Sequence, residues 1–160
     1  FVVDSNEAWK GNAEATKDVP FATGEDLEWE DVIIFSTPTR FGNVPSQIQS
    51  FFDTLGGFWF QGKLANKAVS AMSSAQNPHG GQEATILSLY TTMYHWGAVV
   101  AAPGYTDAVT FAAGGNPYGT SVTVGQDGKI VDDEATIKAA VAHQARRTVK
   151  VGEALKVMNA

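Results

Sequence analysis

The chain has 160 residues, 44% hydrophobic and 18% charged, with a formal net charge of −6 and no cysteine. The length predicts one domain over residues 1–160, and the composition excludes disulfides, thiolate metal sites and thiol catalysis. The acidic balance argues against nucleic acid as a partner. No apolar run is long enough for a membrane span, and the absence of cysteine fits the cytoplasm, where we expect the protein.

Helical and strand-like patterns alternate along the chain after a polar, irregular start. Helical stretches show apolar residues three and four apart, whereas buried strands appear as short, continuous apolar runs. The expected elements are, in chain order, a helical turn at 24–31, a strand at 31–36, a helix at 45–55, a strand at 67–73, a helix at 81–96, a strand within 98–105, a long loop, a strand–turn–strand at 120–131, and a helix at 133–158.

Three successive strand–loop–helix segments predict parallel βαβ units, and therefore an α/β fold with helices on both faces of a sheet. Such sheets bind ligands in the loops beyond the carboxyl ends of their strands. In this chain those loops are 37–43, "TPTRFGN", and 74–81, "SAQNPHGG". Both are rich in glycine, proline and polar groups, so we expect them to form a binding site together.

The first of these loops has a stiff start and a flexible end. Pro38 fixes its own φ and restricts Thr37, while Gly42 permits positive φ or a close approach of another backbone. Such a loop can aim backbone N–H groups at a flat acceptor such as a flavin ring, with Arg40 over a ring face or an anion and Phe41 as a wall. The alternative is a stiff turn with a solvated arginine.

The other candidate residues also carry two interpretations. The amide and small residues of 74–81 suit the edge of a uracil-like ring, but Gly80 and Gly81 also fit the entry of a helix. The stretch "GGFWFQG" places Trp59 in a loop, either as an aromatic wall for a flat substrate or as an anchor of the fold. His95, at the end of a long apolar helix, either contacts a ligand or interacts with the helix C-terminus.

Several kinds of chemistry have little support in this sequence. It contains no nucleophile elbow, no P-loop and no H-E-x-x-H motif, and the three histidines are not at metal-ligand spacing, so we expect no metal site. The carboxylates gather in stretches such as "GEDLEWED" and "DDEA", which we expect to be solvated and away from both glycine-rich loops. If the protein is an enzyme, a cofactor therefore carries its reaction.

An ordered set of motifs resembles one known family. "PTRFGN", then Q-x-x-x-F-x-D-x-x-G-G-x-W, G-K-L-x-x-K, "GGQE", H-x-G and G-G-x-P-Y-G follow one another between Glu25 and the C-terminus. Together they resemble the WrbA family of flavodoxin-like NAD(P)H:quinone oxidoreductases that bind FMN. The resemblance implies a flavodoxin-like twisted parallel sheet of five strands with helices on both faces, and a homotetramer.

The resemblance also implies roles for individual residues. His95 matches a family histidine near the flavin and the substrate, which makes it the candidate catalytic residue. Trp59 and Phe41 are expected to bind the quinone substrate, Trp59 as a wall that a neighbouring subunit can supply. The residues expected to bind FMN, together with His95, are Pro38, Thr39, Arg40, Phe41, Gly42, Asn43, Ser74, Ala75, Gln76, Asn77 and Gly80. In the second loop this chain departs from the family's glycine- and threonine-rich form.

The family's first strand and its phosphate-binding loop have no counterpart in these 160 residues. A sheet without its central strand exposes long unpaired edges, so we expect the functional protein to be longer. The implied activity is the two-electron reduction of quinones through FMN, with NADH or NADPH as hydride donor. Two alternatives stay open at this stage: a flavodoxin-type electron carrier, and a flavin-free binding or scaffold protein.

Overall fold

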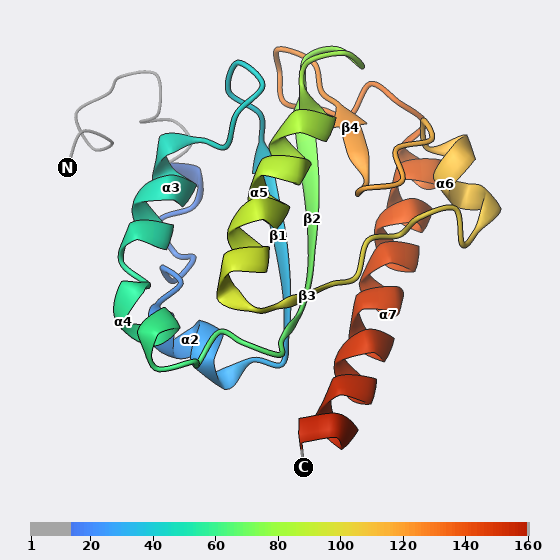
Figure 1. Ribbon diagram of the computed structural model, residues 1–160. Helices are drawn as coiled ribbons and strands as arrows, with labels where there is room; N and C mark the ends of the chain where they lie inside the picture. The colour runs from blue at the N-terminus through green and yellow to red at the C-terminus, as the bar shows by residue number, and fades with distance from the viewer. Residues whose placement is uncertain (1–13, 160) are drawn as a thin grey trace.

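The computed structural model describes residues 14–159, and it has a parallel sheet between two layers of helices (Figure 1). The helices and strands alternate along most of the chain, as the sequence predicts. In order they are α2 (Gly24–Trp29), β1 (Val32–Pro38), α3 (Ser46–Asp53), α4 (Gly56–Phe60), β2 (Ala68–Ala75), α5 (Gln82–Trp96), β3 (Val99–Val100), α6 (Ala108–Ala112), β4 (Ser121–Thr123) and α7 (Glu134–Asn159).

All strand pairs of the sheet are parallel and are organised around β2. The strand β1 pairs with β2 over seven positions, from Val32 opposite Ala68 to Pro38 opposite Ser74. The strands β3 and β4 both pair with β2, β3 near its start and β4 near its end. Since β1 occupies one edge of β2, β3 and β4 lie one after the other along the opposite edge. They form a single interrupted strand.

Helices cover the two faces of β2, as expected for a parallel sheet (Figure 1). Every residue of β2 but one is buried. On one face Val69 and Ala71 join a core with Ile86 and Leu89 of α5. On the other face the Thr148 hydroxyl of α7 donates to the Ser70 hydroxyl at 3.0 Å. The predicted parallel sheet with helices on both faces is therefore confirmed.

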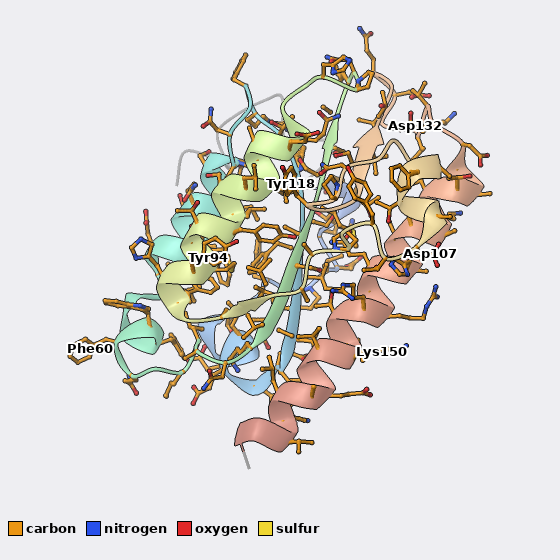
Figure 2. All side chains as sticks on the ribbon, turned by 45° about the vertical axis from the view of Figure 1, so that its right-hand side comes forward. Phe60, Tyr94, Asp107, Tyr118, Asp132 and Lys150 are labelled. Atoms are coloured by element: carbon orange, nitrogen blue, oxygen red, sulfur yellow. The ribbon has the colours of Figure 1, made fainter. Side chains whose placement is uncertain are left out.

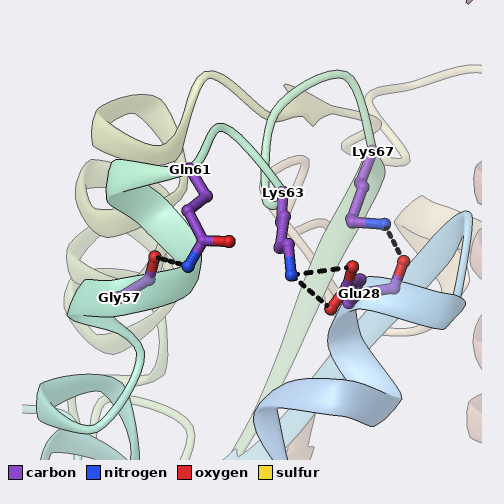
Figure 3. A network of polar contacts seen from close by, with 5 residues as sticks. All are labelled: Glu28, Gly57, Gln61, Lys63 and Lys67. Carbon is purple, nitrogen blue, oxygen red and sulfur yellow. Dashed lines mark hydrogen bonds and ion pairs between the residues drawn. The ribbon is translucent and has the colours of Figure 1, made fainter.

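The helix α2 is fixed at both of its ends by polar contacts. A capping box joins Thr23 and Asp26 at its start. At its end the Lys67 ammonium donates to the Glu28 carbonyl oxygen at 2.9 Å, and Lys63 forms an ion pair with the Glu28 carboxylate (Figure 3). Lys67 also donates to the Glu30 carbonyl oxygen at 2.7 Å. Partial burial lowers the pKa of Lys67. These contacts hold α2 beside the start of β2.

A single buried amide links α7 to both neighbouring segments of the sheet. The Gln144 Oε1 atom accepts from the backbone N–H and the hydroxyl of Thr120, at 2.8 and 2.9 Å, and its Nε2 donates to the Ala71 carbonyl at 2.9 Å. Gly119 lies so close to β2 that an added Cβ would be 2.0 Å from the Ala71 carbonyl oxygen. Hydrogen bonds of Gln144 therefore hold the start of β4 against β2, and the lack of a side chain at Gly119 permits this close approach.

The structure corrects four of the expected elements. Residues 56–60 form the short helix α4, not a loop, so Trp59 lies on a helix. The strand expected within 98–105 has only two residues, Val99 and Val100. The expected long loop contains α6. In 120–131 the second strand is absent, and Val124 and Ile130 form a lone antiparallel bridge.

Four strands pair in the described part of the chain, where the resemblance implied five. The remaining expected elements agree with the structure to within one or two residues at most of their ends. Within residues 14–159, no helix combines the length and the apolar character needed to cross a membrane.

We predict that Gln144→Leu lowers the free energy of unfolding by about 2–5 kcal/mol, because the Thr120 N–H, its hydroxyl and the Ala71 carbonyl lose their partner in a buried site. The control is Gln61→Leu, at an exposed glutamine whose amide donates to the Gly57 carbonyl at 3.0 Å (Figure 3). That change is expected to cost less than about 1 kcal/mol. If chemical denaturation shows the same loss of unfolding free energy in both variants, the buried hydrogen bonds of Gln144 do not contribute more than an exposed one.

Candidate active site

The two glycine-rich loops meet at the carboxyl ends of β1 and β2, at the top of the sheet in Figure 1. The Thr39 N–H donates to the Ser74 carbonyl at 2.9 Å, which extends the ladder of the two strands into the loops. The Thr85 hydroxyl, in the first turns of α5, donates to the Thr39 hydroxyl at 2.8 Å. The structure thus brings both predicted loops together and anchors them to one helix.

The closest approach of the loops is between two glycines. Gly81 has φ of +98°, and a Cβ at this position would lie 2.5 Å from the Gly42 Cα. No side chain fits this contact, and an L residue is strained at this φ. Glycine at position 81 therefore sets the distance between the loops. Gly81 lies in the predicted binding loop 74–81, but its contact with Gly42 was not predicted.

The first loop turns tightly between Arg40 and Asn43, whose backbones exchange hydrogen bonds of 2.9 and 3.0 Å. The two central residues, Phe41 and Gly42, have φ of +52° and +78°, as in a type I′ turn. Positive φ is unfavourable for phenylalanine, yet the Phe41 ring is fully exposed and gains no burial in return. Strain combined with an exposed aromatic ring points to a binding role for this turn.

Asn77 organises the second loop. Its side-chain oxygen accepts from the His79 N–H at 3.0 Å, and its carbonyl accepts from the Gly80 N–H at 3.2 Å and from the Gln82 amide at 2.8 Å. A Cβ on Gly80 would lie 2.4 Å from the Ala75 Cβ, so this glycine allows the loop to fold back on β2. Asn77 therefore shapes the loop through two acceptors.

Backbone donors remain available where the loops meet. Within residues 14–159 the N–H groups of Phe41, Gly42, Gln76 and Asn77 have no hydrogen-bond acceptor. An added Cβ on Gly42 meets no atom within 4 Å, so the space beside this turn is open. A flavin ring offers acceptors at N1, O2, O4 and N5, and open space beside several free N–H donors suits such a ring. The loop residues therefore fit an FMN ring.

A cavity of about 730 Å³ lies beside the second loop, between the start of α5, α6, β4 and the start of α7. The first loop does not line it. Its walls include Glu83, Asp132 and Asp133, so the expectation that carboxylates stay away from both loops was wrong. Asp132 accepts from the Thr123 N–H at 2.6 Å, and hydrogen bonds from Thr136 lower the pKa of Asp133. Asp132 thus ties the segment before α7 to β4, and Asp133 accepts from the Thr136 N–H in the first turn of α7.

Trp59 and His95 lie together, at the other end of α5. The Trp59 indole N–H donates to the His95 carbonyl at 2.8 Å. His95 follows Gln82 by thirteen helical residues, which is about 20 Å along the axis. The α4 end of the molecule is correspondingly distant from the loops in Figure 1. One chain therefore does not bring these two residues to the loops.

This end of the molecule exposes large aromatic side chains. Trp59, Phe60 and Tyr94 are 50%, 84% and 63% exposed. Figure 2 shows Phe60 and Tyr94 on the same side of the molecule, with Phe60 directed away from the protein. The inner side of α5 is buried, with Ile86, Leu89 and Met93 nearly inaccessible. Within one chain, therefore, α5 is buried along one side only.

The chain is similar to a family described as NADPH-dependent FMN reductase, which matches residues 5–112. A Deinococcus radiodurans protein named NAD(P)H dehydrogenase (quinone) is 57% identical over 150 residues, which cover 94% of this chain and 73% of that protein. A protein of the same name from Aromatoleum aromaticum is 40% identical, with 86% of this chain and 68% of that protein covered.

A solved structure shows the same fold. The crystal structure of the flavodoxin, WrbA-like protein from Agrobacterium tumefaciens matches this chain with a TM-score of 0.57 at 18% identity. The match covers 81% of this chain and 71% of that chain. The fold is therefore flavodoxin-like, as the sequence motifs implied.

We predict that Gly81→Ala destabilises the protein by about 1–3 kcal/mol more than Gly114→Ala, as measured by chemical denaturation. The two glycines have nearly the same positive φ, +98° and +99°, but a Cβ on Gly114 meets no atom within 4 Å. The difference isolates the contact with Gly42. Equal loss of unfolding free energy in the two variants would mean that the close contact between Gly81 and Gly42 does not contribute to stability.

Proposed function

The chain belongs to the NADPH-dependent FMN reductase family, and from this premise we propose that it is an FMN-dependent NAD(P)H:quinone oxidoreductase. The relatives from Deinococcus and Aromatoleum, both named NAD(P)H dehydrogenase (quinone), support the proposal. The observation that carries it in this chain is the contact between the two loops, with free backbone donors at the junction. A cytoplasmic location stays a prediction from the absence of cysteine.

The proposed cofactor site consists of the two loops. Bound FMN supplies the two-electron transfer from NAD(P)H to the quinone. The proposed binding residues are those predicted from the sequence: Pro38, Thr39, Arg40, Phe41, Gly42, Asn43, Ser74, Ala75, Gln76, Asn77 and Gly80. The free N–H groups of Phe41 and Gly42, and those of Gln76 and Asn77, then orient the edge of the ring from two sides.

Two exposed side chains of the first loop have separate tasks in this proposal. Phe41 shields the ring or the flat substrate from water, and its strained backbone keeps the side chain on the outside of the turn. Within the described residues, the Arg40 side chain has one hydrogen bond, to the Thr39 carbonyl at 3.4 Å, and no ion pair, so its charge is available. It can balance the negative charge that develops on a reduced flavin.

The remaining site residues require a second copy of the chain. Trp59 and His95 are about 20 Å from the loops along α5. They stand among exposed aromatic side chains that gain burial only against another surface. We infer that subunits of a homotetramer exchange these residues, so that Trp59 of one copy walls the quinone at the loops of another. His95 then hydrogen-bonds the quinone oxygen.

We predict that Gly42→Val weakens FMN binding, because the branched side chain fills the open space in which the ring is proposed to lie. Gly128→Val is the control: its φ of +77° matches the +78° of Gly42, and its added Cβ also meets no atom within 4 Å. Fluorescence titration of the apoproteins measures the affinity, and thermal melting measures the shared strain. An equal change of affinity in both variants would remove this loop from the cofactor site.

We predict steady NAD(P)H consumption with benzoquinone as acceptor, which an electron carrier does not sustain.

Trp59→Ala should raise the quinone KM roughly 5- to 150-fold while FMN remains bound, since one aromatic contact is worth about 1–3 kcal/mol. Val157→Ala, at an exposed apolar residue on α7, should leave the KM unchanged. A fully active monomer in light scattering, or an unchanged KM in the Trp59 variant, would contradict the shared site.

A further inference from the structure

Positive charge is scarce in this chain, and most of it is already used within the fold. There are 11 lysines and arginines against 17 aspartates and glutamates. The Lys67 ammonium is bonded to backbone carbonyls. Five other lysines have carboxylate partners: Lys17, Lys63, Lys129, Lys138 and Lys156. Apart from Lys67, the lysines and arginines without an ion pair within residues 14–159 are Arg40, Arg146, Arg147 and Lys150.

Three of these four unpaired cations line one groove. The groove has a volume of about 430 Å³ and lies between α7 and the segment that follows β3. Thr106 and His143 complete its polar part, and Val151, Ala154 and Leu155 form an apolar part further along α7. Figure 2 shows Lys150 on this helix, below the segment that carries Asp107. None of the lining residues belongs to the two proposed FMN loops.

Arg147 is held in place for binding. Its Nε donates to the Ala102 carbonyl at 2.9 Å, which ties the half-buried guanidinium to the segment that follows β3. Its two terminal nitrogens have no acceptor in the described part of the chain. An arginine oriented by one bond and free at its other donors is suited to an oxyanion, because its remaining N–H groups form a planar fork.

The neighbouring hydroxyl and imidazole orient each other. The Thr106 hydroxyl donates to the Pro103 carbonyl at 2.7 Å, so the same oxygen accepts from the His143 Nε2, 2.9 Å away. The other ring nitrogen of His143 is 4.0 Å from Asp107, which is partly exposed and caps α6. Asp107 is thus the carboxylate at this end of the groove. It forms no ion pair with Arg146, Arg147 or Lys150.

The order of residues along α7 separates charge from apolar surface. Residues 147, 151 and 155 follow one another at intervals of four and therefore share a face of the helix. The first is a cation and the other two are Val151 and Leu155, so the groove changes from positive to apolar within about two turns. Arg146 and Lys150, also four apart, repel each other on the free helix, and a bound anion relieves this repulsion.

We propose that this groove binds a phosphate monoester with a short apolar tail. The phosphate lies among Arg146, Arg147 and Lys150, and the tail lies along Val151, Ala154 and Leu155. A solvated helix face explains the observations less well, because Lys138 on the same helix has its own partner in Glu134 and lines no groove. This site goes beyond the proposed quinone reduction and does not depend on it.

The test is calorimetric titration of the purified protein with hexyl phosphate and, separately, with inorganic phosphate. Hexyl phosphate is expected to bind with one-to-one stoichiometry, more weakly as salt is added, and more tightly than inorganic phosphate, which lacks the tail. Arg146→Gln and Lys150→Gln should each weaken it about tenfold, the loss of one charge-assisted hydrogen bond. Lys138→Gln, on the same helix but outside the groove, should bind like the unmodified protein.

Three results would overturn the proposal. Absence of hexyl phosphate binding to the purified protein would reject the site. Equal affinities in the groove variants and in Lys138→Gln place any binding elsewhere. Loss of self-association in Arg146→Gln, measured by light scattering, would show that carboxylates of a second copy occupy the groove. Arg146 and Lys150 are exposed, and circular dichroism of both variants verifies that the fold is intact.

Discussion

The parallel pairing of β1 with β2 is the constraint on which the proposed active site depends. Seven residue pairs fix the register, so both strands end at the same level, with Pro38 opposite Ser74. The loops that follow therefore start side by side, and the bond from Thr39 to Ser74 continues the ladder into them. A slip of β1 by one residue would turn Ile33 away from the core and separate Gly81 from Gly42. Core burial and loop contact thus require the same register.

The interrupted strand on the other edge of β2 accounts for both cavities. The strand β3 stops before Pro103, and the chain returns to β2 only at β4. The residues between them carry α6, which walls the cavity beside the second loop, and Thr106, which walls the basic groove. Gln144 and Gly119 then fix the point of return. An irregular connection on a rigid sheet therefore creates both binding surfaces.

The sequence predicts most elements because their patterns are local. Apolar runs and helical spacing locate β1, β2, α5 and α7, and the alternation of these elements predicts a parallel sheet. The helix α6 has too few residues for a period to show. Asp132 and Asp133 approach the second loop only because β4 pairs with the end of β2, and this contact spans some fifty residues. Such long-range contacts leave no local pattern.

The candidate site was predicted in part. The loop sequences indicate the right chemistry, since glycine and proline control which backbone donors are free. The contact between Gly42 and Gly81 follows from strand register and is not visible in either loop alone. Motif order suggests that Trp59 and His95 serve the same site as the loops. It does not reveal that the length of α5 separates them within one chain.

The central claim is that the two loops hold an FMN that passes electrons from NAD(P)H to a quinone. Anaerobic absorbance spectroscopy of the purified protein tests it most directly. We predict a visible flavin band that bleaches when NAD(P)H is added and returns when benzoquinone follows. A protein that binds no flavin when supplied with FMN, or a bound flavin that NAD(P)H does not reduce, would contradict the account.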